Sequence, residues 1–301
     1  MKIAIIGSGG REHALAWKFA QSKSADEIYV IPGNGGTKNN VAINSNNFEA
    51  IEKFCKEEQI DLIFVGPEDP LANGIVDYFC DKNIRIFGPD KEAARLEGSK
   101  IWAKRFMKKH GVATADFWME ENGDEEIKKR YGNDADYIVE QKITGQELSI
   151  IGFTDGKDIK LLMTSQDHKP AYDGDTGPNT GGMGAYCPVP FCDEAILADI
   201  KTKIVNPTLK GIQTEKLNYK GVIYFGIMMT EQGPMLLEYN VRFGDPETEV
   251  ILPALKSDLL DLVLSCLDGN LSTFNLAFND GYFVDVVLAS GGYPGSYEKN
   301  K

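Results

Sequence analysis

Two oxygen-bearing side chains, Glu238 and Asn240, alternate in the apolar segment GPMLLEYN. Residues i and i+2 of a β-strand point to the same side, so this carboxylate and this amide should be presented together. Mg²⁺ takes few protein oxygens and keeps its other positions for water and phosphate, which makes such a pair suitable for it. Arg242 and Asp245 follow in VRFGDPETE and gather further charge at the same strand end. We predict a site for Mg²⁺ or Mn²⁺ here; the alternative is an exposed strand face with polar residues.

A second candidate site is the glycine-rich segment DGDTGPNTGGMGAY at residues 173–186. Its glycines predict neither a helix nor a regular strand. Successive backbone amides in such a segment can form a concave nest around a phosphate or a carboxylate. An ordinary flexible surface loop is the alternative.

The chain opens with MKIAIIGSGGREHALAW, a short apolar strand, a glycine turn and a helix. The amides of Gly7–Gly10 at a helix start could hold an anion. The dinucleotide fingerprint G-x-G-x-x-G is incomplete, however, because Glu12 stands where the third glycine belongs. A small phosphate, or no ligand, is therefore favoured over a dinucleotide, and glycines that simply allow a tight turn are the plainest alternative.

The secondary structure predicted around these groups alternates between strands and helices at first and consists of antiparallel hairpins later in the chain. Four apolar segments predict buried strands: KIAII, EIYVIPG, DLIFVGPE and IRIFGP. Two segments between them predict helices, FEAIEKFCKEEQ and LANGIVDYFCDKN. This alternation predicts a parallel sheet covered on both faces. The turns GSGG, PGNGGT and VGPEDPL should then line one crevice at the carboxyl ends of the strands. From residue 137 onward, antiparallel hairpins are expected to turn at Asp155-Gly156 and at Glu231-Gln232-Gly233.

The composition and the net charge of the chain argue against several classes of protein. A chain of 301 residues is long for one core, and two or three packed units are expected. The formal net charge of −13 argues against non-specific binding to nucleic acid or to anionic membranes. We find no apolar run long enough to span a bilayer and no signal segment, so a cytoplasmic protein is expected. The five cysteines are scattered, which argues against a zinc site and against a disulfide framework.

Several long motifs resemble the phosphoribosylamine–glycine ligase family of the ATP-grasp superfamily. They are GSGGREHALAW, PGNGGT, VGPEDPL, LEGSK, TSQDHK, DTGPNTGGMGAY, EYNVRFGDPETE and ASGGYPGSY. The resemblance implies an N-terminal parallel α/β sheet, a mixed α/β and α+β ATP-grasp domain, and the start of a C-terminal domain. The implied boundaries are 1–100 for the substrate-side domain, 101–136 for a helix and shortened lid region, 137–268 for the ATP-grasp domain and 269–301 for the last unit.

The resemblance also implies a reaction. ATP would phosphorylate the carboxylate of glycine, and the amine of 5-phosphoribosylamine would attack the acyl phosphate to give glycinamide ribonucleotide, ADP and phosphate. Such chemistry needs alignment and charge neutralisation more than a protein nucleophile. The expected partners are these small molecules, with no nucleic acid and no membrane, and the chain is expected to be a monomer or a weak homodimer.

Site residues follow from the same resemblance. Glu238 and Asn240 would hold the metal, and Lys104 would reach an ATP phosphate. Glu147 would bind the ribose, and the strand Glu140 to Ile143 would pass the adenine. Arg242 is expected, with Lys104, to be catalytic. The substrate-side residues would be those of the first turn and the glycine-rich loop: Gly9, Gly10, Asp175, Asn179, Thr180, Gly181, Gly182, Met183 and Gly184. The GSGG turn is expected near the phosphate of phosphoribosylamine, with supporting roles or a helix-start salt bridge for Arg11 and His13.

The sequence departs from the family in two places. The interval 118–136, WMEENGDEEIKKRYGNDAD, holds neither the apolar strand nor the glycine-rich lysine loop of the family's nucleotide lid, and Lys128 and Lys129 match nothing there. The segment ASGGYPGSYEKNK stops where the family continues. A lid-less, non-catalytic relative that binds a nucleotide or a phosphoribosyl ligand is therefore the alternative function.

Overall fold

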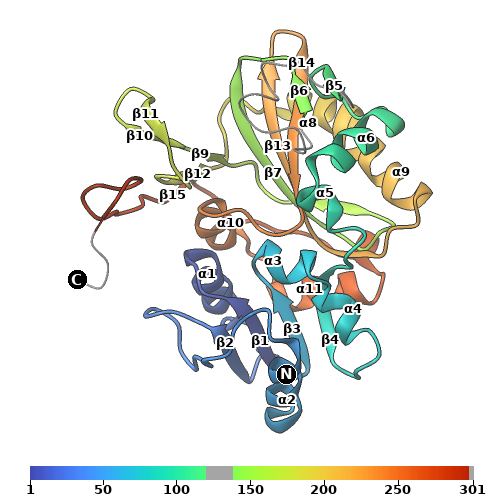
Figure 1. The fold of residues 1–301 in the computed structure, drawn as a ribbon, viewed down its shortest axis with the longest axis vertical. Coiled ribbons are helices and arrows are strands. Elements are labelled where there is room, and N and C mark those ends of the chain that lie inside the picture. Colours follow the sequence, from blue (N-terminus) through green and yellow to red (C-terminus); the bar gives the residue numbers. More distant parts are fainter. Residues whose placement is uncertain (120–137, 298–301) are drawn as a thin grey trace.

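A parallel sheet forms the N-terminal part of the computed structural model, which describes residues 1–119 and 138–297. Its strand order is β2-β1-β3-β4, with Ile3 on the central strand facing Ile28 on one side and Leu62 on the other (Figure 1). The four strands predicted from the sequence are confirmed. Their bounds are Lys2–Gly7 for β1, Glu27–Pro32 for β2, Leu62–Val65 for β3 and Arg85–Pro89 for β4.

This sheet continues without a break into an antiparallel half. The end of β4 pairs with the start of β13, where Pro89 faces Tyr219, and β13 then pairs with β7 and β14. Both predicted hairpin turns are confirmed, since Asp155-Gly156 lies between β7 and β8 and Glu231-Gln232 between β13 and β14. The bounds are Gln146–Thr154 for β7, Ile159–Leu161 for β8, Tyr219–Thr230 for β13 and Gly233–Asn240 for β14.

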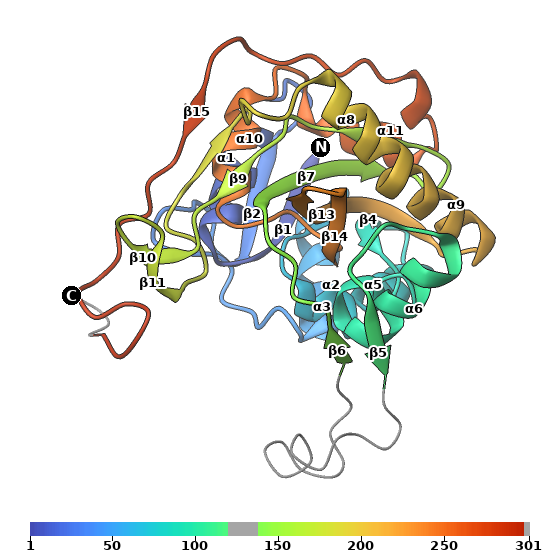
Figure 2. The same cartoon turned by 90° about the horizontal axis from the view of Figure 1, so that it is seen from above.

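Helices cover both faces of the eight-stranded sheet, as Figure 2 shows from above. Alternation along each strand sends side chains to two separate cores: Ile3 and Ile5 of β1 pack on one face, Ala4 and Ile6 on the other. Three helices cover the first face: α1 (Gly10–Phe19), α10 (Glu247–Ala254) and α11 (Leu259–Leu267). The second face is covered by α2 (Phe48–Glu58), α3 (Glu68–Ala72), α4 (Ile75–Phe79), α5 (Arg95–Gly98), α6 (Lys100–His110), α8 (Glu194–Ile200), the π-helical turn η1 (Lys201–Val205) and α9 (Asn206–Thr214).

One predicted helix is broken. The segment LANGIVDYFCDKN was expected to be helical, but α3 ends at Ala72 and α4 begins at Ile75. Gly74 between them adopts a φ of 88°, a left-handed conformation that stops a right-handed helix.

Small strand pairs project from the main sheet. β12 (Ala185–Cys187) pairs with β9 (Gln166–Asp167) and β15 (Phe283–Val284), and β5 (Phe117–Met119) pairs with β6 (Ile138–Glu140). The prediction that the glycine-rich segment 173–186 forms no regular strand was wrong at two places: Thr176–Asn179 form β11, and Ala185 and Tyr186 belong to β12. The pairing of β11 with β10 (Pro170–Tyr172) has an irregular register, and Gly177, at a φ of 89°, lies beside the ring of Tyr172. Most of the interval 118–136, including Lys128 and Lys129, lies outside the described residues.

Four phenylalanines join the two halves of the sheet. Phe64 on β3 stacks on Phe87 on β4 at 5.0 Å between ring centroids, and Phe87 lies 5.6 Å from Phe153 on β7. Phe243, after β14, closes the cluster at 5.7 Å from Phe153. All four rings are almost completely buried, so the parallel and antiparallel halves share one core here.

Among the described residues, no helix is long and apolar enough to cross a membrane.

Replacing Phe153 by alanine should lower the free energy of unfolding by about 3–5 kcal/mol, because it removes the ring that contacts both halves of the cluster. Urea unfolding followed by circular dichroism measures this loss. Tyr282→Ala is the matched control, since Tyr282 is 68% exposed and its truncation should change stability by less than about 0.5 kcal/mol. Equal effects of the two substitutions would contradict a shared core.

Candidate active site

A β-bulge decides which way Glu238 and Asn240 point. Gly226 of β13 faces Glu238 of β14, but the next residue, Ile227, faces Leu236, so Leu237 is an extra residue on β14. The extra residue shifts the alternation, and Leu236 and Tyr239 both enter the core on one face. Glu238 and Asn240 consequently share the opposite side, as their spacing predicts, and the side chain of Glu238 is 47% exposed.

A cavity of about 210 Å³ brings these two residues to Lys104. It lies between β14 and the helices α5 and α6, and Lys100 and Glu97 also line it. Lys100 Nζ is 3.9 Å from Glu238 Oε2. A lysine predicted on a helix and a carboxylate–amide pair predicted on a strand more than a hundred residues later therefore line one cavity.

Lys104 is held in place by local structure. Ser99 caps α6, its side-chain oxygen accepting a hydrogen bond from the Trp102 amide at 3.3 Å, and Lys104 lies on the buried face of that helix. Its ammonium donates to Thr114 Oγ1 at 2.7 Å and forms an ion pair with Glu140 of β6. Lys104 was expected at an ATP phosphate and Glu140 beside the adenine, yet these two side chains contact each other here.

The predicted adenine strand borders a second cavity of about 400 Å³. Residues 141–146 form one wall, and the turn between β13 and β14 together with Met229 and Met235 forms the other. Ile143 lines this cavity, whereas Glu140 points to Lys104.

Glu147 has a cationic partner that the sequence interpretation did not assign. Lys169 Nζ lies 3.1 Å from Glu147 Oε2 and 3.8 Å from Asp167 Oδ2. Burial lowers the pKa of Lys169, but the neighbouring carboxylates of Asp167 and Glu147 outweigh burial and raise it overall. The spacing of Asp167 and Lys169 in TSQDHK, two residues apart, is the signal that could have identified this cation.

Arg242 links β14, the strand that carries Glu238 and Asn240, to the N-terminal part of the chain. Its guanidinium donates to Asn240 Oδ1 at 3.0 Å and forms ion pairs with Glu97 at 2.8 Å and Glu68 at 3.4 Å. Glu97 in turn accepts a hydrogen bond from the Val241 amide at 2.7 Å. Neither carboxylate was predicted as a site residue, although each lies in a motif that carried the resemblance, VGPEDPL and LEGSK.

The first glycine turn is faced by carboxylates. The Gly9 amide donates to Glu12 Oε2 at 2.6 Å, and the Arg11 amide approaches Asp245 Oδ2 at 3.4 Å. A Cβ on Gly10 would lie 2.6 Å from Glu249 Oε1. The helix-start salt bridge is present, with Arg11 Nε 2.6 Å from Glu12 Oε1. The position of a substrate phosphate at Gly9 and Gly10 stays a prediction, and it would meet negative charge there.

The glycine turns do converge as predicted. Asn34 of PGNGGT donates through Nδ2 to the carbonyls of Ser8 and Gly9 at 3.1 and 2.9 Å. A Cβ on Gly66 of VGPEDPL would lie 2.1 Å from Glu12 Oε1, so this third turn reaches the same place.

The loop from Asn179 to Gly184 uses several of its amides internally. Thr180 and Met183 donate to the carbonyls of Lys169 and His168, at 2.8 and 2.7 Å. The Gly182 amide donates to Thr180 Oγ1 at 3.0 Å, and that of Gly181 to the Tyr293 hydroxyl at 3.1 Å. An anion nest here, and the role of the exposed Asp175, stay predictions; an anion at Gly181 would have to replace Tyr293.

The fold and this geometry define an ATP-grasp type of protein: a parallel α/β sheet joined to an antiparallel sheet whose hairpin presents a carboxylate and an amide toward a buried lysine. Residues 1–97 match the family profile described as "Phosphoribosylglycinamide synthetase, N domain", and residues 120–248 match "Phosphoribosylglycinamide synthetase, ATP-grasp (A) domain". The chain belongs to the phosphoribosylamine–glycine ligase family.

Individual relatives agree with this assignment. The phosphoribosylamine–glycine ligase of Clostridium acetobutylicum is 43% identical over 342 positions, covering 99% of this chain and 82% of the relative. The human trifunctional purine biosynthetic protein adenosine-3 is 41% identical, with 99% of this chain matching 34% of that protein. The crystal structure of the Thermotoga maritima ligase superposes with a TM-score of 0.80 at 33% identity, covering 99% of this chain and 83% of that one. Alignments of more than 340 positions to 301 residues mean that the relatives hold extra residues inside the matched region.

The buried carboxyl group of Glu249 predicts a pH dependence of stability. Burial, reinforced by the charge of Asp245, raises the pKa of Glu249 from 4.5 to about 8. The folded chain therefore holds a proton that the unfolded chain releases, and the free energy of unfolding should fall as pH rises through this window, by at most about 1.4 kcal/mol per unit.

Glu249→Gln should remove this contribution, so the variant should gain stability relative to the parent at pH 8 but not at pH 4.5. Urea unfolding at half-unit intervals of pH tests this, with Glu231→Gln in the exposed β13–β14 turn as the control. Parallel pH profiles for the parent and both variants would contradict the prediction.

Proposed function

We propose that the chain ligates glycine to 5-phosphoribosylamine at the expense of ATP, through glycyl phosphate, to form glycinamide ribonucleotide, ADP and phosphate. Membership of the ligase family supports the reaction. The observation that carries it for this chain is the cavity in which Lys104 meets Glu238 and Asn240. We further propose that it acts in the cytoplasm, as a monomer or a weak homodimer.

The donor set fits Mg²⁺ bound together with a nucleotide. Glu238 and Asn240 supply two oxygens, and in residues 1–119 and 138–297 no group of three or more acidic, histidine or cysteine side chains could hold a metal by itself. A cation at this pair would complete its shell with water and phosphate oxygens, as Mg²⁺ does, and Mn²⁺ would serve in the same way. Bound there, the metal would neutralise phosphate charge during transfer.

The residues of the chain bind and orient the reactants. Lys104 would exchange Glu140 for an ATP phosphate, while Glu147 would bind the ribose and the strand from Glu140 to Ile143 would contact the adenine. Arg242 holds the Asn240 amide oxygen from one side and would contact the acyl phosphate. No protein nucleophile is needed, because aligned reactants and fixed charges supply the rate acceleration.

Substrates would enter from the other side of the cavity. We propose that Gly9 and Gly10, with Asp175 and the loop from Asn179 to Gly184, line the site for phosphoribosylamine and glycine. The proposed units are 1–100 on the substrate side, 101–136 as helix and shortened lid region, 137–268 as ATP-grasp domain and 269–301 as the start of a further unit.

A second function deserves a test because of one sequence observation. Segment 118–136 holds no glycine-rich lysine loop, and a chain without a lid would bind nucleotide yet leave it open to water. Such a protein would act as a nucleotide or phosphoribosyl sensor. Glycine-dependent release of ADP, with glycinamide ribonucleotide detected by mass spectrometry, separates the two functions.

Glu238→Gln should reduce kcat at least about 100-fold at saturating Mg²⁺, because the metal loses its charged ligand. A steady-state ADP-release assay measures this, and a Mg²⁺ titration should show a weakened dependence on the metal. Glu194→Gln, an exposed carboxylate in the first turn of α8 that lines neither cavity, is the control and should retain the parent's activity. An active Glu238→Gln enzyme would exclude this metal site.

Lys104→Met should raise the KM for ATP roughly tenfold or more, with a smaller effect on the KM for glycine, because it removes a charge-assisted contact to phosphate. Kinetics with each substrate varied in turn test this selectivity. Lys108→Met, one turn further along α6 and exposed, is the matched control. A uniform rise in all KM values would indicate a structural role for Lys104 instead.

A further inference from the structure

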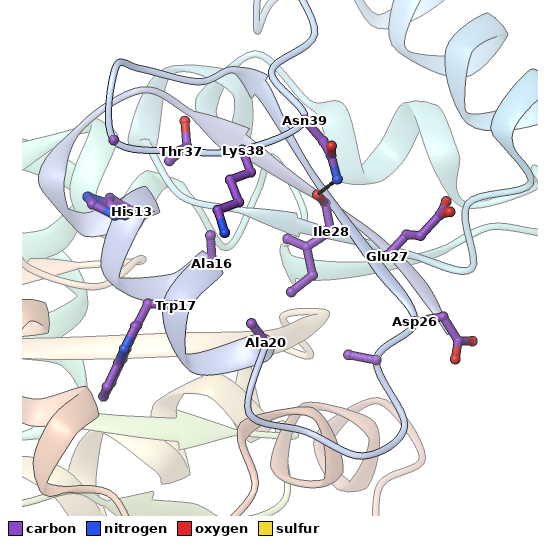
Figure 3. Close-up of a pocket in the computed structure, with 12 residues that line it drawn as sticks. His13, Ala16, Trp17, Ala20, Asp26, Glu27, Ile28, Thr37, Lys38 and Asn39 are labelled. Carbon is purple, nitrogen blue, oxygen red and sulfur yellow. Dashed lines mark hydrogen bonds between the residues drawn. The ribbon is translucent and has the colours of Figure 1, made fainter.

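A hollow of about 400 Å³ lies on the N-terminal part of the chain, outside the candidate active site. Figure 3 shows it between α1, the start of the edge strand β2 and the loop at residues 36–39. None of the residues discussed above as metal, nucleotide or substrate ligands lines it. Its volume falls within the range of small-molecule sites in proteins.

The floor of the hollow is apolar and made of short side chains. Ala16 lies on α1 and Ala20 follows one turn later as its C-cap residue, so the end of this helix presents a shallow surface opposite Ile28 of β2. Trp17 lies at the edge and leaves 47% of its surface exposed, although it is one of the largest apolar side chains in the chain. This surface is shaped for a flat apolar group.

Two nitrogen-bearing side chains at one end have no partner. Among the described residues, the side chains of Lys38 and His13 make no hydrogen bond or ion pair, and in Figure 3 the amino group of Lys38 reaches from the loop toward Ala16. At the other end the carboxylates are already neutralised: Asp26 lies 2.6 Å from the N-terminal ammonium and Glu27 2.9 Å from Lys2 Nζ. Free positive charge is thus confined to the Lys38 end.

The wall that carries Lys38 is fixed by its own hydrogen bonds. Thr37 Oγ1 donates to Asn40 Oδ1 at 2.6 Å, and Asn39 Nδ2 donates to the Ile28 carbonyl at 3.1 Å. The ring of His13 packs so closely against Gly36 that a Cβ there would lie 2.6 Å from His13 Cε1. Because this wall is already ordered, it loses little conformational entropy of its own when a ligand binds.

We propose that this hollow binds a small planar aromatic acid. Its ring lies on Ala16, Ala20 and Ile28 beside the Trp17 indole, and its single carboxylate or phosphate group lies at Lys38 and His13. Asn34, in the same loop, holds the carbonyls of Ser8 and Gly9, so the ligand contacts the loop that supports the first glycine turn.

The test uses the full chain with ¹³C-labelled alanine and isoleucine methyl groups, titrated with indole-3-acetate and with the neutral indole-3-acetamide. The acid should shift the methyl signals of Ala16, Ala20 and Ile28 and leave that of Ile143 unchanged. Lys38→Met should weaken binding of the acid roughly three- to tenfold and leave the amide unaffected, because only a charge contact is lost. Lys23→Met, an exposed lysine outside the hollow, is the control.

Ala20→Leu fills the floor and should abolish binding of both probes while the remaining methyl spectrum stays that of the folded chain. Three results would overturn the proposal: no methyl shift at millimolar probe, shifts confined to Ile143 and its surroundings, or equal affinity for the acid and the amide. Because the readout is binding at labelled methyl groups, it holds whether or not the chain proves to be an active ligase.

Discussion

The ion pair between Arg242 and Glu97 joins the two halves on which the site depends. The side chains are only 17% and 12% exposed, so both charges have lost most of their water and need each other. Glu97 also accepts the Val241 amide, and Arg242 also orients the Asn240 oxygen. One interaction therefore fixes the end of β14, the amide ligand of the proposed metal site and the helix α5 that borders the cavity. Burial raises the pKa of Glu97 while Arg242 opposes that rise, which shows how closely this carboxylate relies on its partner.

Glu12 distinguishes the opening turn from the dinucleotide-binding turn that its first two glycines resemble. Its carboxylate occupies the space that two glycines leave open, since a Cβ on Gly7 or Gly66 would lie 2.4 or 2.1 Å from it. It also accepts the Gly9 amide and pairs with Arg11. In dinucleotide-binding proteins the start of this helix receives a pyrophosphate. Here the chain supplies its own anion, so the glycines permit close packing of a side chain rather than close approach of a cofactor.

The sequence predicted what local pattern determines. Apolar runs between turn residues located β1 to β4, and the spacing of Glu238 and Asn240 placed both on one side of a strand. Contacts between distant segments have no such local pattern in the sequence. One is the pairing of Pro89 with Tyr219, which joins the parallel and antiparallel halves into one sheet. Another is the pair of ion pairs that Arg242 forms with Glu68 and Glu97. The β-bulge at Leu237 could not be predicted from the sequence either, because an extra residue in a strand is defined only by the pairing with the partner strand. The break between α3 and α4 at Gly74 could have been predicted, because a glycine in the middle of a helical pattern is a local signal. The prediction of one continuous helix gave more weight to the apolar spacing than to this glycine.

Three cations at the candidate site already have a carboxylate partner: Lys104 has Glu140, Lys169 has Glu147 and Arg242 has Glu97. In a chain of net charge −13, these pairs keep the three cations ordered without a ligand, but they also reduce the positive charge that is free to bind a nucleotide. A triphosphate that binds these three cations must therefore displace carboxylates, and a metal bound with it would add positive charge. Glu140 and Glu147 can be displaced, because their side chains are 34% and 41% exposed and regain water when released. Glu97 cannot, because it is buried and bound to the backbone of Val241. Arg242 accordingly stays a fixed element, while a metal at the proposed site of Glu238 and Asn240 would carry most of the charge that phosphate transfer requires.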